Sequence, residues 1–110
     1  PFAPLFSRAS LIVHIGGVGT TGLAMRSGVP MLIVPQAHDQ FDHAARVTRL
    51  GIGRKLLKSR YSFENVVQEL QALIDDKRYA QRAAKVGEAV RRENGVLSAC
   101  DALEKLLPKT

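Results

Sequence analysis

The chain has 110 residues, of which 45% are hydrophobic, and a formal net charge of +6 at pH 7. This length and apolar content predict one globular domain with a modest core, and no stretch approaches the roughly 20 apolar residues of a membrane-spanning helix. The lone cysteine, Cys100, excludes an intrachain disulfide and a cysteine-based metal site.

The first predicted elements are a strand, a glycine loop, a helix and a second strand. Apolar runs at residues 11–15 and 31–34 are typical of short strands buried on both faces. Residues 20–26 between them favour a helix, which Gly28 and the following Pro30 end. A crossover of this kind makes the two strands parallel, so both end at the same edge of the sheet.

The rest of the chain is predicted to be mainly helical. Five further elements are expected: helix 42–50, edge strand 54–57, helix 63–74, helix 78–93 and helix 96–107. Ser62 is a suitable N-cap for the third of these, and Pro108 ends the last. The expected fold class is therefore α/β: a partial Rossmann-like unit with a short parallel sheet, flanking helices and a helical C-terminal tail.

So few strands make an unbalanced domain, because a parallel sheet needs both faces covered. The chain also opens at Pro1 with no preceding strand. We therefore expect residues 1–110 to be the C-terminal portion of a larger domain, with exposed apolar edges that favour association. No basic segment leads into an apolar signal core, which favours a cytoplasmic protein.

The positive charge does not by itself predict nucleic-acid binding. Much of it lies in residues 77–92, where the basic side chains follow helical spacing beside an apolar series, as on a solvated helix face. Tyr79 is almost alone among them as an aromatic residue that could stack on a base. We expect no nucleic acid among the partners.

A glycine-rich run, His14-Ile15-Gly16-Gly17-Val18-Gly19-Thr20-Thr21, directly follows the first strand. Glycines let backbone N–H groups approach an anion, and the helix that begins near Thr20 directs its positive end to the same place. The threonine hydroxyls and the imidazole of His14 can add hydrogen-bond donors. The run therefore predicts a phosphate site.

Asp39 and Gln40 follow the second strand and so lie at the same sheet edge. They offer an acceptor and a donor side by side, which matches the vicinal hydroxyls of a hexose. Phe2 could stack on a nucleobase if its segment folds back to this edge. Together these residues suit a diphosphate joined to a sugar.

Other interpretations of these motifs are open. Residues 17–22 satisfy the dinucleotide-binding fingerprint, but Pro35-Gln36 stands where its acidic residue is expected, and the lysine of a P-loop is missing. Asp39, Asp42 and His43 would share one helical face and could bind a metal or simply form a polar helix start. A glycine loop that only turns the chain would explain neither His14 nor the Asp39-Gln40 pair.

The motifs resemble the C-terminal, donor-binding part of the UDP-glycosyltransferase superfamily of GT-B fold, and most closely that of bacterial natural-product and macrolide glycosyltransferases. Three segments carry the resemblance: Phe2-Ala3-Pro4, His14 to Thr21, and Val34-Pro35-Gln36-Ala37-His38-Asp39-Gln40. The resemblance implies inverting transfer of a sugar from a UDP- or TDP-sugar to a hydroxyl of a small-molecule or lipid acceptor. The nucleotide sugar is then a substrate, and no metal or other cofactor is implied.

The same resemblance implies the role of each site residue. The donor diphosphate would be bound by His14, Gly16, Gly17, Val18, Gly19 and Thr20, the sugar by Asp39 and Gln40, and the nucleobase by Phe2. No catalytic residue is expected in this chain, because the base belongs to an N-terminal domain, so the fragment alone is predicted to be inactive. The alternatives are a non-catalytic donor-binding or scaffold subunit that needs a partner chain, and a dinucleotide-binding fragment.

Overall fold

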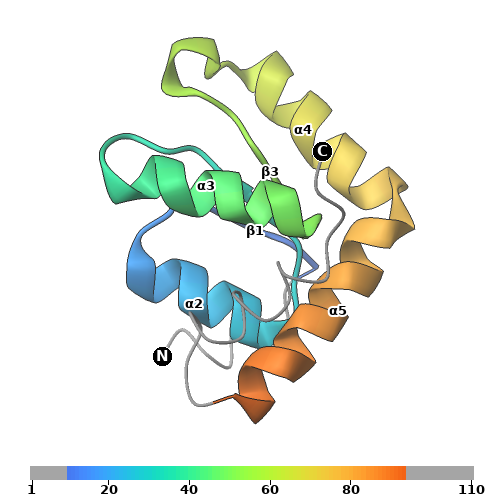
Figure 1. Ribbon diagram of the computed structural model, residues 1–110. Helices are drawn as coiled ribbons and strands as arrows, with labels where there is room; N and C mark the ends of the chain where they lie inside the picture. The colour runs from blue at the N-terminus through green and yellow to red at the C-terminus, as the bar shows by residue number, and fades with distance from the viewer. Residues whose placement is uncertain (1–9, 94–110) are drawn as a thin grey trace.

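The computed structural model describes residues 10–93. They form a three-stranded parallel sheet with helices on both faces (Figure 1). In chain order the elements are β1 (Ile12–His14), α2 (Val18–Ser27), β2 (Met31–Ile33), α3 (Asp39–Leu50), β3 (Gly53–Lys55), a 3-10 turn (Lys58–Arg60), α4 (Phe63–Asp75) and α5 (Lys77–Arg92). The predicted α/β class and short parallel sheet are confirmed.

The three strands end level with one another at one edge of the sheet. The strand order is β1-β2-β3, and His14 lies opposite Ile33, which lies opposite Lys55. The ladder continues one step further, because the Val34 N–H donates to the His14 carbonyl at 2.8 Å. The loops after β1 and β2 therefore leave the sheet side by side, as the crossover predicted.

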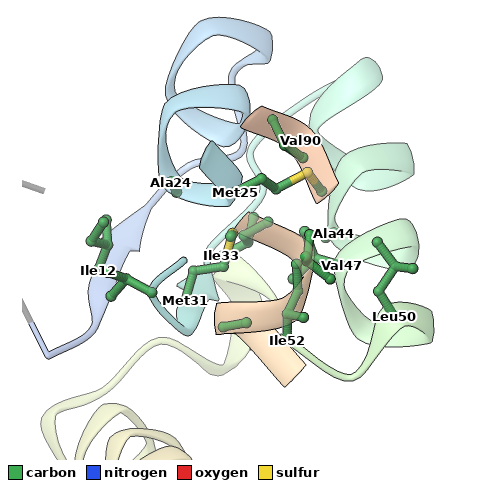
Figure 2. Packing of buried hydrophobic residues seen from close by; sticks show 13 residues of the cluster. Ile12, Ala24, Met25, Met31, Ile33, Ala44, Val47, Leu50, Ile52 and Val90 are labelled. Atoms are coloured by element: carbon green, nitrogen blue, oxygen red, sulfur yellow. The ribbon is translucent and has the colours of Figure 1, made fainter. Parts of the chain in front are cut away.

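Alternating residues of β2 supply a core to each face of the sheet. Met31 and Ile33 face α2, α3 and α5, while Leu32 and Val34 face α4. Figure 1 shows α2 and α3 side by side on one face, and Figure 2 shows Met31, Val47 and Ile52 packed together in that larger core. The continuous burial predicted for this strand is confirmed, and it fixes β2 as the centre of the sheet.

The outer edge of β1 pairs with no strand within residues 10–93. Val13 and Ile15, on and just after β1, are 48% and 50% exposed, so the burial on both faces predicted for residues 11–15 is wrong for this strand. An apolar strand edge of this kind favours association, and the association predicted above stays a prediction.

Two helices begin two or more residues earlier than predicted. Helix α2 begins at Val18, two residues before the expected start. Its first turn includes Gly19, which is tolerated there because the N–H groups of a first turn make no intrahelical hydrogen bonds. Helix α3 begins at Asp39, not at Asp42, which places Asp39 and Gln40 in its first turn. A carboxylate is favoured there by the helix dipole. Strand β3 likewise covers Gly53–Lys55, one residue before the predicted start.

The helical C-terminal half of the described chain follows the prediction. Ser62 caps α4 by accepting the Asn65 N–H at 3.1 Å. On α5 the predicted apolar series, including Ala83, Val86 and Val90, is buried, while the basic side chains are exposed. No helix within residues 10–93 is long and apolar enough to cross a bilayer. The predicted helix 96–107 and Cys100 lie outside the described residues.

Candidate functional site

Gly16 packs the glycine loop directly against the start of α3. Its φ is +94°, a conformation that side chains rarely adopt. A Cβ added there would lie 2.9 Å from Ile33 Cγ2 and 3.1 Å from the Gln40 carbonyl oxygen. Both the dihedral and the contact therefore require glycine, and they bring the predicted phosphate loop against the predicted sugar-binding pair.

Gly17 and Gly19 have no such packing reason to be glycine. A Cβ built on either residue meets no atom within 4 Å, and neither has a positive φ. The first bond of α2 runs from the Thr21 N–H to the Gly17 carbonyl at 2.9 Å. The N–H groups of residues 18–20 therefore have no partner inside the helix, and Gly17 and Gly19 carry no side chain that could cover them. This is the arrangement that binds an anion at a helix N-terminus.

His14, at the end of β1, is hydrogen-bonded to the backbone of the glycine loop. Its Nδ1 accepts the Gly16 N–H at 3.0 Å, and its Nε2 lies 3.3 Å from Met31 Sδ. The ring proton is therefore on Nε2, on the sheet side. A direct bond from His14 or from the Gly16 N–H to a phosphate requires these contacts to be exchanged, so both assignments stay predictions.

The environment of His14 keeps its ring neutral. Burial, and to a lesser extent the nearby His43, lowers the pKa of His14 to about 4. Protonation of Nδ1 would also remove the acceptor of the Gly16 N–H. At neutral pH the ring therefore carries no charge and stabilises the loop through its hydrogen bond with the Gly16 N–H.

The stability of the fold is expected to fall with acidity through this ring. Between the unfolded pKa of 6.5 and the folded pKa of about 4, the unfolded chain binds a proton that the folded His14 does not. Lowering the pH through this window should remove about 1 kcal/mol of unfolding free energy, allowing for solvent near the ring. Urea unfolding from pH 7.5 to 4.5 measures it. His14→Gln should flatten this part of the profile, and an unchanged slope would contradict the assignment.

Asp39 and Gln40 lie in the first turn of α3, with Asp39 exposed. Gln40 Oε1 accepts the N–H groups of Gln36, at 2.8 Å, and Ala37, at 3.1 Å. Its amide nitrogen makes no hydrogen bond to any residue that the structure describes. The pair therefore presents a carboxylate and an amide donor, while Gln40 Oε1 holds the backbone of residues 36 and 37 in place.

A strained turn sets the direction in which α3 begins. The Gln40 N–H donates to the Ala37 carbonyl at 3.1 Å, and His38 has φ 48° and ψ −124°. These are the dihedrals of the second residue of a type II′ turn, a position that glycine usually occupies. Strain at a non-glycine residue is kept where the surroundings determine the geometry, as at binding sites.

A pocket of about 520 Å³ extends from this edge between α2 and α3. Its lining comes from two helix faces: Val18, Thr21, Gly22 and Met25 of α2, and Asp39, Asp42, His43, Ala45, Arg46 and Arg49 of α3. Thr21 is 5% exposed, and its hydroxyl has no hydrogen-bond partner within residues 10–93. On each helix most of these residues follow i, i+3, i+4 spacing and so share one face. The sequence pattern alone does not predict the groove, because it also requires the two helices to lie side by side on the sheet.

The structure thus brings together those predicted site residues that lie within residues 10–93. The glycine loop and Asp39-Gln40 meet through Gly16, whereas Phe2 lies outside the described residues. The sequence suggested His43 as a metal ligand or as part of a polar helix start, whereas in the structure it is hydrogen-bonded to the glycine loop. No group of three potential metal-ligand side chains is found in the part of the chain described.

Residues 1–98 match the family model of the erythromycin biosynthesis protein CIII-like C-terminal domain. The chain belongs to this family. The resemblance to bacterial macrolide glycosyltransferases is therefore confirmed, and the parallel unit in Figure 1 is the C-terminal unit of the GT-B fold.

Named relatives of this CIII-like domain are glycosyltransferases. The sterol 3-beta-glucosyltransferase of Kluyveromyces lactis is 37% identical over 99 residues, and the O-mycaminosyltylonolide 6-deoxyallosyltransferase of Streptomyces fradiae is 38% identical over 102 residues. The matches cover 90% and 92% of the chain, but the chain spans only 8% and 24% of these enzymes.

The solved structures include the spinosyn rhamnosyltransferase SpnG complexed with thymidine diphosphate. Its TM-score is 0.79 at 26% identity, and the match covers 94% of this chain and 29% of SpnG. The same enzyme is also solved with the spinosyn aglycone. The CIII-like domain therefore has the fold of the matching part of an enzyme that has been solved with thymidine diphosphate.

Proposed function

We propose that this chain forms the donor-binding portion of an inverting glycosyltransferase that moves a sugar from a UDP- or TDP-sugar to a hydroxyl acceptor. One observation carries the proposal. Gly16, two residues before the N-terminus of α2, packs against the Gln40 backbone at the start of α3, and Val18 and Asp39 line the same pocket. A diphosphate and the sugar attached to it need donors for the phosphates and paired polar groups for the ring hydroxyls, side by side.

The diphosphate lies at the N-terminus of α2. The N–H groups of Gly17, Val18, Gly19 and Thr20 donate to its oxygens, and the helix dipole adds a partial positive charge. Negative charge grows on the diphosphate as the bond to the sugar breaks. Fixed amides aimed at that charge stabilise the transition state more than the ground state. His14 holds the loop in place and, by exchanging its contacts, becomes a further donor.

The sugar lies at the N-terminus of α3. Asp39 accepts hydrogen bonds from ring hydroxyls, and the amide nitrogen of Gln40 donates to a neighbouring one. The bonds that Gln40 Oε1 makes to Gln36 and Ala37 fix this amide before the sugar arrives. Phe2 stacks on the nucleobase.

The acceptor and the base that deprotonates it come from elsewhere in the enzyme. The relatives named above act on a sterol and on O-mycaminosyltylonolide, which supports a small-molecule or lipid hydroxyl as acceptor. This chain then supplies donor binding and leaving-group stabilisation, and it is inactive when alone.

Calorimetric titration of the chain with TDP, UDP and NADH tests the proposed ligand class. We expect saturable binding of a nucleoside diphosphate and at least about tenfold weaker binding of the dinucleotide. The reason is that this chain lacks the acidic residue that binds the ribose in dinucleotide-binding units. Tighter binding of NADH than of either nucleoside diphosphate would overturn the proposal in favour of a dinucleotide-binding unit.

A further inference from the structure

We propose that His43 is a positioning residue for the donor site, because its hydrogen bond to the Gly16 carbonyl sets the direction of the Gly17 N–H. The inference rests on the proposed function, since it assigns a role in diphosphate binding to a side chain outside the glycine loop. It concerns a single peptide group, the one that joins Gly16 to Gly17.

The hydrogen bond links two distant segments. His43 lies on α3, one turn after Asp39, and its Nδ1 is 2.5 Å from the Gly16 carbonyl oxygen, 27 positions away in sequence. A carbonyl oxygen only accepts, so the His43 ring proton is on Nδ1. The ring is partly buried, which shields the bond from competing water.

The geometry of a trans peptide transmits this bond to the site. The carbonyl of Gly16 and the N–H of Gly17 belong to one planar unit and point in opposite directions. No cis peptide occurs in residues 10–93. With the carbonyl held toward α3 by His43, the Gly17 N–H is turned away from α3, next to the first turn of α2.

Glycines on both sides make such a restraint necessary. Gly16 and Gly17 rotate about their backbone bonds more freely than other residues, so the peptide between them can turn over at low energy. His14 holds the preceding peptide through the Gly16 N–H, at 3.0 Å, but it does not hold the carbonyl. Within residues 10–93, this carbonyl is held by the hydrogen bond from His43. Preorganised donors bind an anion more tightly than mobile ones.

Two substitutions of His43 separate positioning from packing. The side-chain amide of His43→Asn places an N–H donor close to the position of Nδ1, whereas His43→Leu fills the space without a donor. TDP affinity is measured by calorimetry, and the Gly17 amide is followed by ¹⁵N NMR. We expect His43→Leu to weaken TDP binding by about tenfold, the effect of one mispositioned hydrogen bond, and His43→Asn to restore most of it.

The Gly17 amide signal distinguishes the outcomes. It should shift on TDP addition in the wild type and in His43→Asn, but little in His43→Leu. Equal affinity and an equal Gly17 shift in all three proteins would overturn the positioning role and leave the donor-binding function standing. If His43→Leu does not fold, the same comparison is made with His43→Gln, whose nitrogen lies farther out. Failure of the wild type to bind TDP overturns both proposals.

Discussion

Replacing Gly53 with Ala is expected to lower the free energy of unfolding by about 3 kcal/mol, the upper range for overpacking a core. A Cβ at this position would collide with the Met31 carbonyl oxygen and lie 2.6 Å from Val47 Cγ1. Met31 is part of the β2–β3 ladder and Val47 is fully buried, so neither atom can move without disturbing the sheet or α3. The absence of a side chain at Gly53 therefore allows α3 to pack closely against β3.

Thermal unfolding followed by circular dichroism measures this effect. A loss of about 3 kcal/mol corresponds to a fall in Tm of roughly 15 °C for a domain of this size. Gly19→Ala is the matched control, because its Cβ meets nothing within 4 Å and alanine favours the helix. Its Tm should be equal to or above that of the wild type. Equal Tm values for Gly53→Ala and the wild type would contradict the packing of α3 on β3.

Replacing Gly19 with Leu should weaken nucleoside diphosphate binding by about 100-fold, the loss of one or two hydrogen bonds to a charged group. The space in front of Gly19 is open, so the side chain fits the folded protein without a clash. It then covers the first-turn N–H groups of α2, which the diphosphate needs. The effect separates binding from stability, because the Tm is expected to change little.

Ala80→Leu provides the control for Gly19→Leu. Ala80 is exposed on α5, away from the residues of the proposed site, so the same added bulk should leave both Tm and TDP affinity unchanged. Calorimetry with TDP compares the three proteins. TDP affinity of Gly19→Leu within about threefold of the wild type would show that the diphosphate does not lie at the N-terminus of α2.

Hydropathy patterns and punctuating residues were sufficient to predict most of the fold. The burial of β2, the end of α2 near Gly28 and the N-cap of α4 at Ser62 all depend on residues close together in the sequence. The start of α3 was predicted wrongly because it depends on the turn at His38. That backbone conformation is unfavourable for a histidine in isolation, and only the surrounding fold holds it.

The candidate site could be located from sequence more readily than its internal contacts. His14, the glycine loop and Asp39-Gln40 could be placed at one sheet edge because parallel strands end together. Which atoms of His14 and Gly16 are already hydrogen-bonded depends on side-chain packing against Met31 and His43. Sequence spacing carries no information on such contacts, so the structural role of His43 emerged only from the fold.

The central claim is that the glycine loop and Asp39-Gln40 form the two halves of one nucleotide-sugar site. Residue-resolved ¹⁵N NMR of the chain, titrated with UDP and then with UDP-glucose, tests it most directly. Both ligands should shift the amides of residues 17–20, and the sugar should add shifts at residues 36–40, because it lies at the start of α3. Shifts confined to other elements, or identical patterns for the two ligands, would contradict the claim.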